Sequence, residues 1–419
     1  MVQTKLVPKK RFKEFQNTNA WELSRLGDVI EKMYNGQTPS RFNGDNWNGD
    51  INWLSSGELN RGIVTETVEK ITAAGQKNAN LRIVPKGIFV MAITGLEAAG
   101  TRGNCAVLGI DTTLNQSCMA LFPQLNVLDT RFLFQWYRKV GEDYGISYTQ
   151  GTKQQSYNAE LVKTLPITLP EIEEQKKIGQ FFTNLDCLIT LHQSKLEKTK
   201  ALKSAYLSEM FPVEGEREPK RRFAGFTQAW EPRKLGEMSK KIEYGLNASA
   251  TIFDGINKYI RITDIDDDSK LFNQSALTSP DVDLSNTDSY RLKNGDILFA
   301  RTGASVGKTY HYKESDGKVY YAGFLIRARI NEDYDSEFVF QNTLTPKYDN
   351  FIKITSQRSG QPGVNAQEYA SFELMVPTLE EQQKIGTFFK ALDGTIAHHR
   401  KKMEKLQSIK KAYLNEMFI

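Results

Sequence analysis

Two long stretches of the chain carry apolar residues at steps of three and four, the spacing that lines one face of an α-helix. The first covers residues 173–211 and the second covers 380–418. At 1.5 Å per residue, each stretch predicts a helix roughly 55 Å long. Thr378 and Glu381 have capping-box spacing at the start of the second helix, and Pro212 ends the first.

Outside these stretches the pattern changes to short apolar runs separated by glycines and turn residues. Strand-like runs occupy 87–93, 258–262 and 296–300, and helical patches lie near 129–140 and 336–345. This mixture predicts an α+β fold with an irregular, largely antiparallel sheet before each long helix.

The two predicted helices are copies of each other. At an offset of 207, 22 of the 39 aligned positions are identical, against roughly 2 expected by chance. Trp21 and Trp230 open similar segments at an offset of 209, and the run Pro8–Phe12 recurs as Pro219–Phe223. The repeat predicts a duplicated domain-plus-helix module. It divides the chain into domain 1 (residues 1–166), helical region 1 (167–212), domain 2 (213–374) and helical region 2 (375–419).

Helices this long need a partner for their apolar stripe. We expect the two copies to pair antiparallel about a pseudo-two-fold axis, as a spacer between the domains. The alternative is two separate coiled coils used for homodimerisation. His192 and His399 are equivalent and central. They are therefore expected to meet across the seam as a hydrogen-bonded pair, because no third ligand for a metal is apparent.

Composition narrows the class of protein. The 419 residues are 39% hydrophobic and 25% charged, as in ordinary soluble proteins. No apolar run approaches ~18 residues, so no membrane span is expected, and the first residues lack a signal peptide's apolar core. Cys105, Cys118 and Cys187 have no metal-site spacing and suit a reducing, cytoplasmic compartment. The net charge of +5 permits a nucleic-acid partner.

The run from Gly303 to Thr309 looks like a phosphate-binding loop, but only three residues separate its glycines and a β-like segment follows it. We therefore expect a tight loop that carries Arg301, Ser305 and Lys308 to a surface. A nucleotide-using enzyme remains the weaker alternative. No metal cluster, nucleophile elbow or carboxylate pair stands out elsewhere, so no catalytic residue is predicted.

Several motifs, found twice or in a characteristic order, resemble those of a known family, the specificity subunit of type I restriction-modification systems. They are the helix openings at Pro170–Phe182 and Pro377, the Trp-Glu-x-x-x-Leu-Gly openings at Trp21 and Trp230, and the runs Gly36–Ser40, Trp53–Gly57 and Lys293–Lys308.

The resemblance implies two target-recognition domains, each reading half of a split double-stranded DNA sequence, with the helices as a ruler between them. It also implies that the helices dock two methyltransferase subunits, which methylate adenine with S-adenosylmethionine, and that ATP- and magnesium-dependent restriction subunits join them. The chain itself would bind no cofactor and catalyse nothing.

Specific readout of DNA uses Arg or Lys for guanine and Asn or Gln for adenine. Turn-rich segments of both domains supply such residues, and these are the predicted DNA contacts: Arg102, Thr149, Gln150, Lys153, Gln154, Arg301, Ser305, Lys308, Gln357, Arg358 and Gln361. The adjacent aromatics Phe181-Phe182 and Phe388-Phe389 predict one ring of each pair at the helix seam and the other against a methyltransferase subunit. A coiled-coil scaffold without DNA contact is the alternative function.

Overall fold

The computed structural model describes residues 6–98, 100–149 and 155–419. The chain forms two compact units: residues 1–191 with 402–419 (unit 1), and residues 192–401 (unit 2). The unit boundaries fall inside the two long helices, so each helix gives one end to each unit. The division therefore differs from the predicted one, in which the helices were separate segments, because their ends are built into the domain cores.

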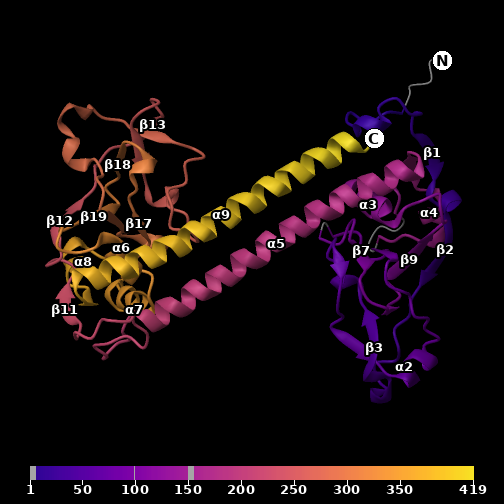
Figure 1. Ribbon diagram of the computed structural model, residues 1–419, viewed down its shortest axis with the longest axis horizontal. Coiled ribbons are helices and arrows are strands. Elements are labelled where there is room, and N and C mark those ends of the chain that lie inside the picture. Colours follow the sequence, from indigo (N-terminus) through magenta and orange to yellow (C-terminus); the bar gives the residue numbers. More distant parts are fainter. Residues whose placement is uncertain (1–5, 99, 150–154) are drawn as a thin grey trace. The chain divides into compact units, whose positions relative to one another are not determined.

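Unit 1 holds a five-stranded sheet in the order β2-β9-β6-β7-β4, a smaller sheet β5-β3-β8, and the pair β1-β10. Most pairings are antiparallel; β4-β7 and β3-β8 are parallel. Its elements, labelled in Figure 1, are β1 Glu22–Arg25, α1 Leu26–Val29, β2 Ile30–Asn35, β3 Trp47–Leu54, β4 Ile63–Val64, β5 Glu69–Ile71, α2 Ala73–Asn78, β6 Phe89–Ala92, β7 Cys105–Leu108, β8 Thr113–Leu114, β9 Cys118–Pro123, α3 Thr130–Ser147, α4 Ala159–Thr164, β10 Pro166–Leu169 and the first half of α5 Ile172–Met210.

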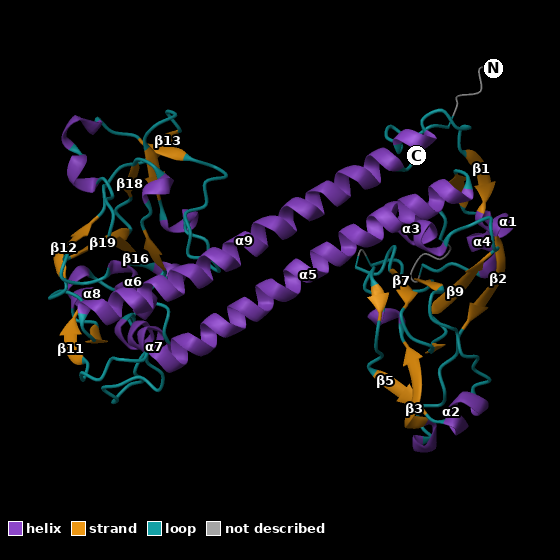
Figure 2. Ribbon diagram, in the orientation of Figure 1, coloured by secondary structure: helices purple, strands orange, loops and turns teal. Residues whose placement is uncertain are grey.

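Unit 2 holds an antiparallel sheet in the order β12-β19-β16-β17, with the pairs β13-β15, β14-β18 and β11-β20 beside it. The secondary structure is shown by colour in Figure 2. Its elements are β11 Glu231–Lys234, β12 Ser239–Tyr244, β13 Ala250–Ile252, β14 Lys258–Ile260, β15 Thr278–Pro280, β16 Asp296–Ala300, β17 Thr309–His311, β18 Val319–Tyr321, β19 Leu325–Ile330, α6 Ser336–Asn342, α7 Pro346–Thr355, α8 Ala366–Ala370, β20 Glu373–Val376 and the first part of α9 Leu379–Met417. The predicted α+β class is confirmed, and so are the predicted strand and helix runs.

The long helices end inside the domain cores. In unit 1, Phe182 of α5 and Phe418, just after α9, pack with Trp21 and Phe132. Unit 2 repeats this cluster with its own residues, Phe389, Phe211, Trp230 and Phe338. Burying a large aromatic side chain contributes about 1.5–3 kcal/mol. The aromatic residues shared by the two repeats therefore fix each helix end to its own unit.

Within each unit the two helices run antiparallel, as predicted. In unit 1, Phe181 packs on Tyr413 and Asp186 accepts a hydrogen bond from Lys410. In unit 2, Tyr206 packs on Phe388. Further along the same helices, the Nδ1 atoms of His192 and His399 are 3.0 Å apart. The predicted histidine contact is therefore confirmed.

The structure shows where both rings of each phenylalanine pair lie, whereas the contact of one ring with a methyltransferase subunit stays a prediction. Phe182 and Phe389 are fully buried in the domain cores. Phe181 lies between Tyr413 and Phe12, and Phe388 lies between Tyr206 and Phe223. The repeated runs 8–12 and 219–223, called the arms below, therefore pack against Phe181 and Phe388, and both rings are half-buried.

Each arm also inserts an arginine into the start of a long helix. Arg11 donates to both carboxylate oxygens of Glu174, at 2.9 and 2.5 Å, and Arg222 does the same with Glu381, at 2.9 and 2.7 Å. Both glutamate side chains are 1% exposed. The repeated helix motif thus serves contacts inside the protein, which accounts for its near identity in the two copies.

Candidate nucleic-acid interface

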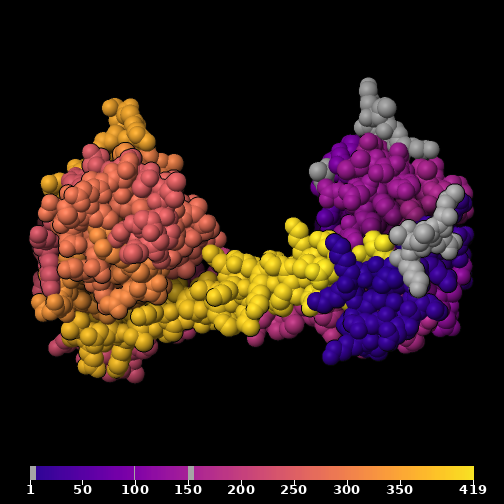
Figure 3. Space-filling view, turned by 90° about the horizontal axis from the view of Figure 1, so that it is seen from above, coloured from indigo at the N-terminus to yellow at the C-terminus, as the bar shows by residue number. Residues whose placement is uncertain are grey.

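The predicted DNA contacts of unit 2 come from two loops that the fold joins. One loop connects β16 to β17 and carries Gly303; the other follows α7 over residues 356–364. Thr302 bridges Gly363, Gly303 N donates to Pro362 O at 3.0 Å, and Val364 N donates to Arg301 O at 2.9 Å. The segment after α7 forms part of the orange projection at the surface of this unit in Figure 3.

Two buried tyrosines hold the backbone of the Gly303 loop from the side of the domain core. Tyr369 donates to Ala300 O at 2.6 Å and Tyr348 donates to Gly307 O at 3.0 Å. Burial raises the pKa of both hydroxyls, so they stay neutral donors. The loop therefore has a fixed backbone on which exposed side chains can be presented.

Arg301 and Gln361 both belong to this loop pair, where Arg301 is half-buried. The Arg301 guanidinium is 5.0 Å from the centre of the Tyr244 ring and 3.5 Å from Gly323 O. Gln361 is exposed, and its amide lies where a β-carbon on Gly303 would come within 3.0 Å. Gly303 has a φ of +73°, so both its conformation and this close neighbour favour glycine.

The remaining predicted DNA contacts of unit 2 differ in how exposed their side chains are and in whether they already pair with another residue. Gln357 is exposed and Ser305 is half-buried. Arg358 is exposed but donates to Glu368 at 2.5 Å, so part of its charge is already neutralised. Lys308 was expected at the surface, but its side chain is only 8% exposed. Its Nζ lies 2.6 Å from Asp267.

The resemblance of this loop to a nucleotide site does not extend to its geometry. The amides of Val306, Gly307 and Lys308 donate to carbonyl oxygens of the loop itself. Strand β17 follows directly, so the loop does not lead into the N-terminus of a helix as a phosphate-binding loop does. Lys308 Nζ donates to Ile265 O. These donors are therefore occupied within the protein, which argues against the enzyme alternative.

Unit 1 places a matching loop pair at the ends of its strands. Thr94 bridges Ser156, Leu96 N donates to Gln155 O at 3.1 Å, and Gly95 has a φ of +73°, the same as Gly303. The two units thus share the backbone frame at this position. They differ in the side chains that the frame carries, since Glu97 stands where unit 2 has Ser305 and Gly100 stands where it has Lys308.

Arg102 folds back onto its own loop, where Nε donates to Leu96 O and Nη2 donates to Glu97 O, each at 2.7 Å. Thr149 is half-buried and donates to Gly145 O at the end of α3. The other predicted contacts of this unit, Gln150, Lys153 and Gln154, lie outside the described residues.

Sequence reasoning missed two exposed aromatics beside Arg301. Tyr244 ends β12 and is 40% exposed; Phe324 precedes β19 and is 63% exposed. Arg301 N donates to Phe324 O at 3.1 Å, which ties Phe324 to the same edge. Neither residue is distinctive in the sequence, because aromatic residues in strand-like runs more often belong to the core.

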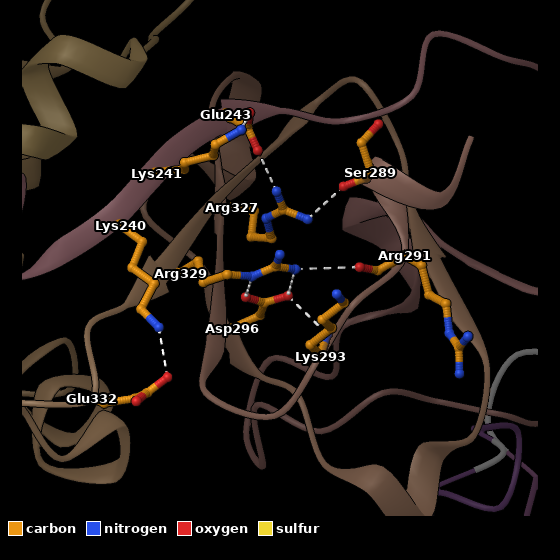
Figure 4. A network of polar contacts seen from close by, with 10 residues as sticks. All are labelled: Lys240, Lys241, Glu243, Ser289, Arg291, Lys293, Asp296, Arg327, Arg329 and Glu332. Atoms are coloured by element: carbon orange, nitrogen blue, oxygen red, sulfur yellow. Dashed lines mark hydrogen bonds and ion pairs between the residues drawn. The ribbon is translucent and has the colours of Figure 1, made fainter. Parts of the chain in front are cut away.

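Unit 2 also contains a buried polar network beside the sheet (Figure 4). Arg329 donates through Nε and Nη2 to the two oxygens of the fully buried Asp296, each at 2.8 Å. On the next row of the sheet, Arg327 is 1% exposed and donates to Glu243 and to Ser289 O. These contacts pair the buried Asp296 carboxylate within the domain, although Arg327 Nε finds no hydrogen-bond partner among the described residues, and we assign the network a structural role.

Within the parts of the chain that the structure describes, no group of three or more His, Cys, Asp or Glu side chains is arranged to hold a metal ion. A search of the same residues finds no helix of the length and apolarity that a membrane crossing requires.

Comparison with known proteins agrees with the fold and with the duplication of the chain. Residues 19–201 and 227–408 each match the family described as type I restriction modification DNA specificity domain, and the chain belongs to this family. It is similar to the MjaVIII specificity subunit of Methanocaldococcus jannaschii, a type I restriction enzyme subunit, with 24% identity over 97% of this chain and 94% of that one.

Two further similarities cover nearly the whole chain. The putative MjaX specificity subunit of the same organism is 22% identical over 94% of this chain and 92% of that one. The crystal structure of the type I restriction-modification S subunit from M. genitalium matches with a TM-score of 0.70, 14% identity and 99% coverage of both chains. This structural likeness supports the fold over the full length.

Proposed function

We propose that the chain is the sequence-specific DNA-binding subunit of a type I restriction-modification complex, and that it reads a two-part, asymmetric target. The supporting observation is the loop pair that recurs with the same backbone frame and different side chains in each unit. A shared frame keeps the mode of docking, and different side chains give different base preferences. One chain would then recognise two unlike half-sites.

In unit 2, Arg301, Gln357 and Gln361 are the proposed base-reading side chains, with Ser305 and Arg358 beside them. Arg301 suits guanine and the glutamines suit adenine. Tyr244 and Phe324 offer apolar surface for a thymine methyl group or a sugar at the same edge. In unit 1, the corresponding role falls to the segment from Thr149 to Gln155 and to the Gly95 loop.

The proposed partners are two methyltransferase subunits and the restriction subunits. S-adenosylmethionine, ATP and magnesium would be used by those subunits, and this chain would be a non-catalytic member of the complex. Phe181 and Phe388 are half-buried against the arms, so we look to more exposed apolar side chains for the rest of the docking surface. Leu188, Leu191 and Leu202 of α5 are 44%, 46% and 45% exposed, which makes them the proposed contacts with a methyltransferase subunit.

A duplex-binding assay with the methyltransferase subunits present tests this function. The complex should prefer one sequence, and its affinity should fall as salt rises. Arg301→Ala should weaken specific binding by about 1–3 kcal/mol and relax the preference at one position. The control is Lys240→Ala, which removes an exposed lysine paired with Glu332 away from the loop pair. Binding without sequence preference would instead support the scaffold alternative.

A further inference from the structure

Unit 2 contains an acidic hairpin, residues 264–272, that follows β14; we call it the acidic strap. Ile265 bridges Phe272, and Asp266 N donates to Leu271 O at 2.9 Å. The Asp266 carboxylate accepts from Ser269 N and Oγ at 2.7 and 2.6 Å. The hairpin is therefore closed by its own hydrogen bonds, and these hold the Asp266 carboxylate in place.

The acidic strap connects the recognition domain to both long helices. Asp266 Oδ1 lies 3.4 Å from Arg400 Nη1 of α9, and Asp268 Oδ2 lies 3.6 Å from Arg400 Nη2. Asp268 Oδ2 also lies 3.8 Å from Lys200 Nζ of α5. Figure 2 shows loops of this unit descending from the region of β13 and β18 toward α9.

A third contact ties the acidic strap to the loop pair. Asp267 lies 2.6 Å from Lys308 Nζ, and the same nitrogen donates to Ile265 O at 3.1 Å. Lys308 ends the loop that begins with Arg301. The acidic strap thus contacts both the helices and the proposed DNA-reading loop. All of these contacts come from the four residues 265–268.

The acidic strap is a second point of attachment between the domain and α9. The first is the hydrophobic core around Ile385 and Phe389. Arg400 follows Phe389 by 11 positions, which is about 16 Å along a helix. One attachment point leaves a domain free to tilt about it, and a second point at this distance opposes the tilt.

Unit 1 has no equivalent of this strap among its described residues. Its matching segment carries Asn60 and Arg61, and Arg61 donates to Asn104 and to Arg102 O within the domain. The helix positions equivalent to Arg400 and Lys200, at the repeat offset of 207, are Gln193 and Gln407. Unit 1 joins its domain to α5 through a different ion pair, Arg138 with Asp186 at 3.0 Å, so among the described residues the acidic strap is found in unit 2.

We propose that Asp266, Asp268 and Arg400 are positioning residues that restrict the number of base pairs allowed between the two half-sites. The inference rests on the proposed function. One base pair moves a half-site by roughly 3.4 Å along the duplex. A domain held at two points resists this displacement, whereas a domain without the acidic strap can tilt to follow it.

The test uses the full chain with its methyltransferase subunits. Modified-base mapping of the wild type first gives the target and its spacing, n. Methylation is then measured on duplexes with spacings n−1, n and n+1. Arg400→Gln, and Asp266→Asn with Asp268→Asn, should each raise methylation at n−1 or n+1 relative to n by roughly two- to fivefold, because exposed ion pairs are individually weak. Glu332→Gln, which breaks an exposed pair elsewhere in the unit, should leave the ratio unchanged.

Two further measurements separate positioning from a general gain in DNA affinity. Raising the salt concentration should relax spacing in the wild type and have little effect in the variants, since salt screens these pairs. Arg400→Lys, which keeps the positive charge opposite Asp266 and Asp268, should keep the wild-type ratio. An unchanged ratio in the neutralised variants would overturn the spacing role alone, as would an equal gain at every spacing. A wild type without a two-part motif would overturn the proposed function as well.

Discussion

The contribution of a single charge to the stability of this protein depends on whether its side chain is buried or exposed. Asp296 is fully buried and faces Arg329 through two hydrogen bonds, whereas Glu332 is an exposed partner of Lys240 (Figure 4). Removing one member of a buried pair leaves the other charge without compensation, but an exposed pair is screened by water. The two sites therefore offer a matched comparison inside one unit.

We expect Asp296→Ala to destabilise unit 2 by about 3–5 kcal/mol, and Glu332→Ala to change stability by about 1 kcal/mol or less. Urea denaturation followed by circular dichroism measures both. Equal losses in the two variants would show that Arg329 does not depend on Asp296.

The histidine pair makes a separate prediction about pH. Burial lowers the pKa of His399, and the charges of His192, His398 and Lys195 lower it further. The unfolded state therefore binds a proton more readily than the folded state, so stability should fall as pH drops through about 6.5 and below. Two protonated rings also cannot share the Nδ1 to Nδ1 hydrogen bond.

His399→Gln should weaken this acid sensitivity, because an amide can donate and accept without titrating. Thermal unfolding between pH 5 and 8 measures the effect, and His398→Gln, on the exposed side of the same helix, is the control. A wild-type melting temperature that does not change between pH 5 and 8 would contradict the proposed effect of His399 protonation on stability.

At the scale of elements, the arms decide how the long helices are held. Arg11 and Arg222 reach carboxylates that are almost completely buried at the helix starts. Arg222→Ala should therefore cost about 3–5 kcal/mol, because Glu381 would keep a buried and unpaired charge. Its neighbour Arg221, which pairs with Glu209 at the surface, is a matched control.

Hydrogen exchange measures this loss locally. Amides in the first turns of α9 should exchange faster in Arg222→Ala and should be unaffected in Arg221→Ala. Uniform protection in both variants would mean that the arm contributes nothing to the helix start.

The same elements show what the sequence could predict. The helices, the main strand runs and the histidine contact followed from periodicity and from the repeat. The packing of Phe12 on Phe181 and of Phe223 on Phe388 could not be predicted in this way. The two residues of each pair lie more than 160 positions apart along the chain. Periodicity reports which face of a helix is apolar, but it does not identify the segment that covers that face.

The candidate site could be predicted only in part, because the sequence does not show which distant residues pack against a loop. Turn-rich segments with Arg and Gln were predicted as DNA contacts, and the structure joins the segment of Arg301 to the segment of Gln361 through backbone hydrogen bonds. Their contact with DNA stays a prediction. Lys308 and Arg102 resemble them in sequence but bind groups within the protein. Whether a cation in a loop is free depends on distant residues such as Asp267, which local patterns do not reveal.

At the scale of the whole molecule, the account holds that one chain carries two independent readers on copied helices. Replacing residues 1–166 with the corresponding segment of another family member should change one half of the target and leave the other half intact. The hybrid's methylation motif, compared with that of the wild type, measures this. A change in both halves would contradict independence of the readers.

The most direct test of the central claim is modified-base mapping of DNA from cells that express this chain with its methyltransferase subunits. The account predicts one motif with two unlike specific halves separated by a fixed number of unspecified base pairs, and methylated adenine in each half. No methylated motif, or a single uninterrupted one, would contradict it.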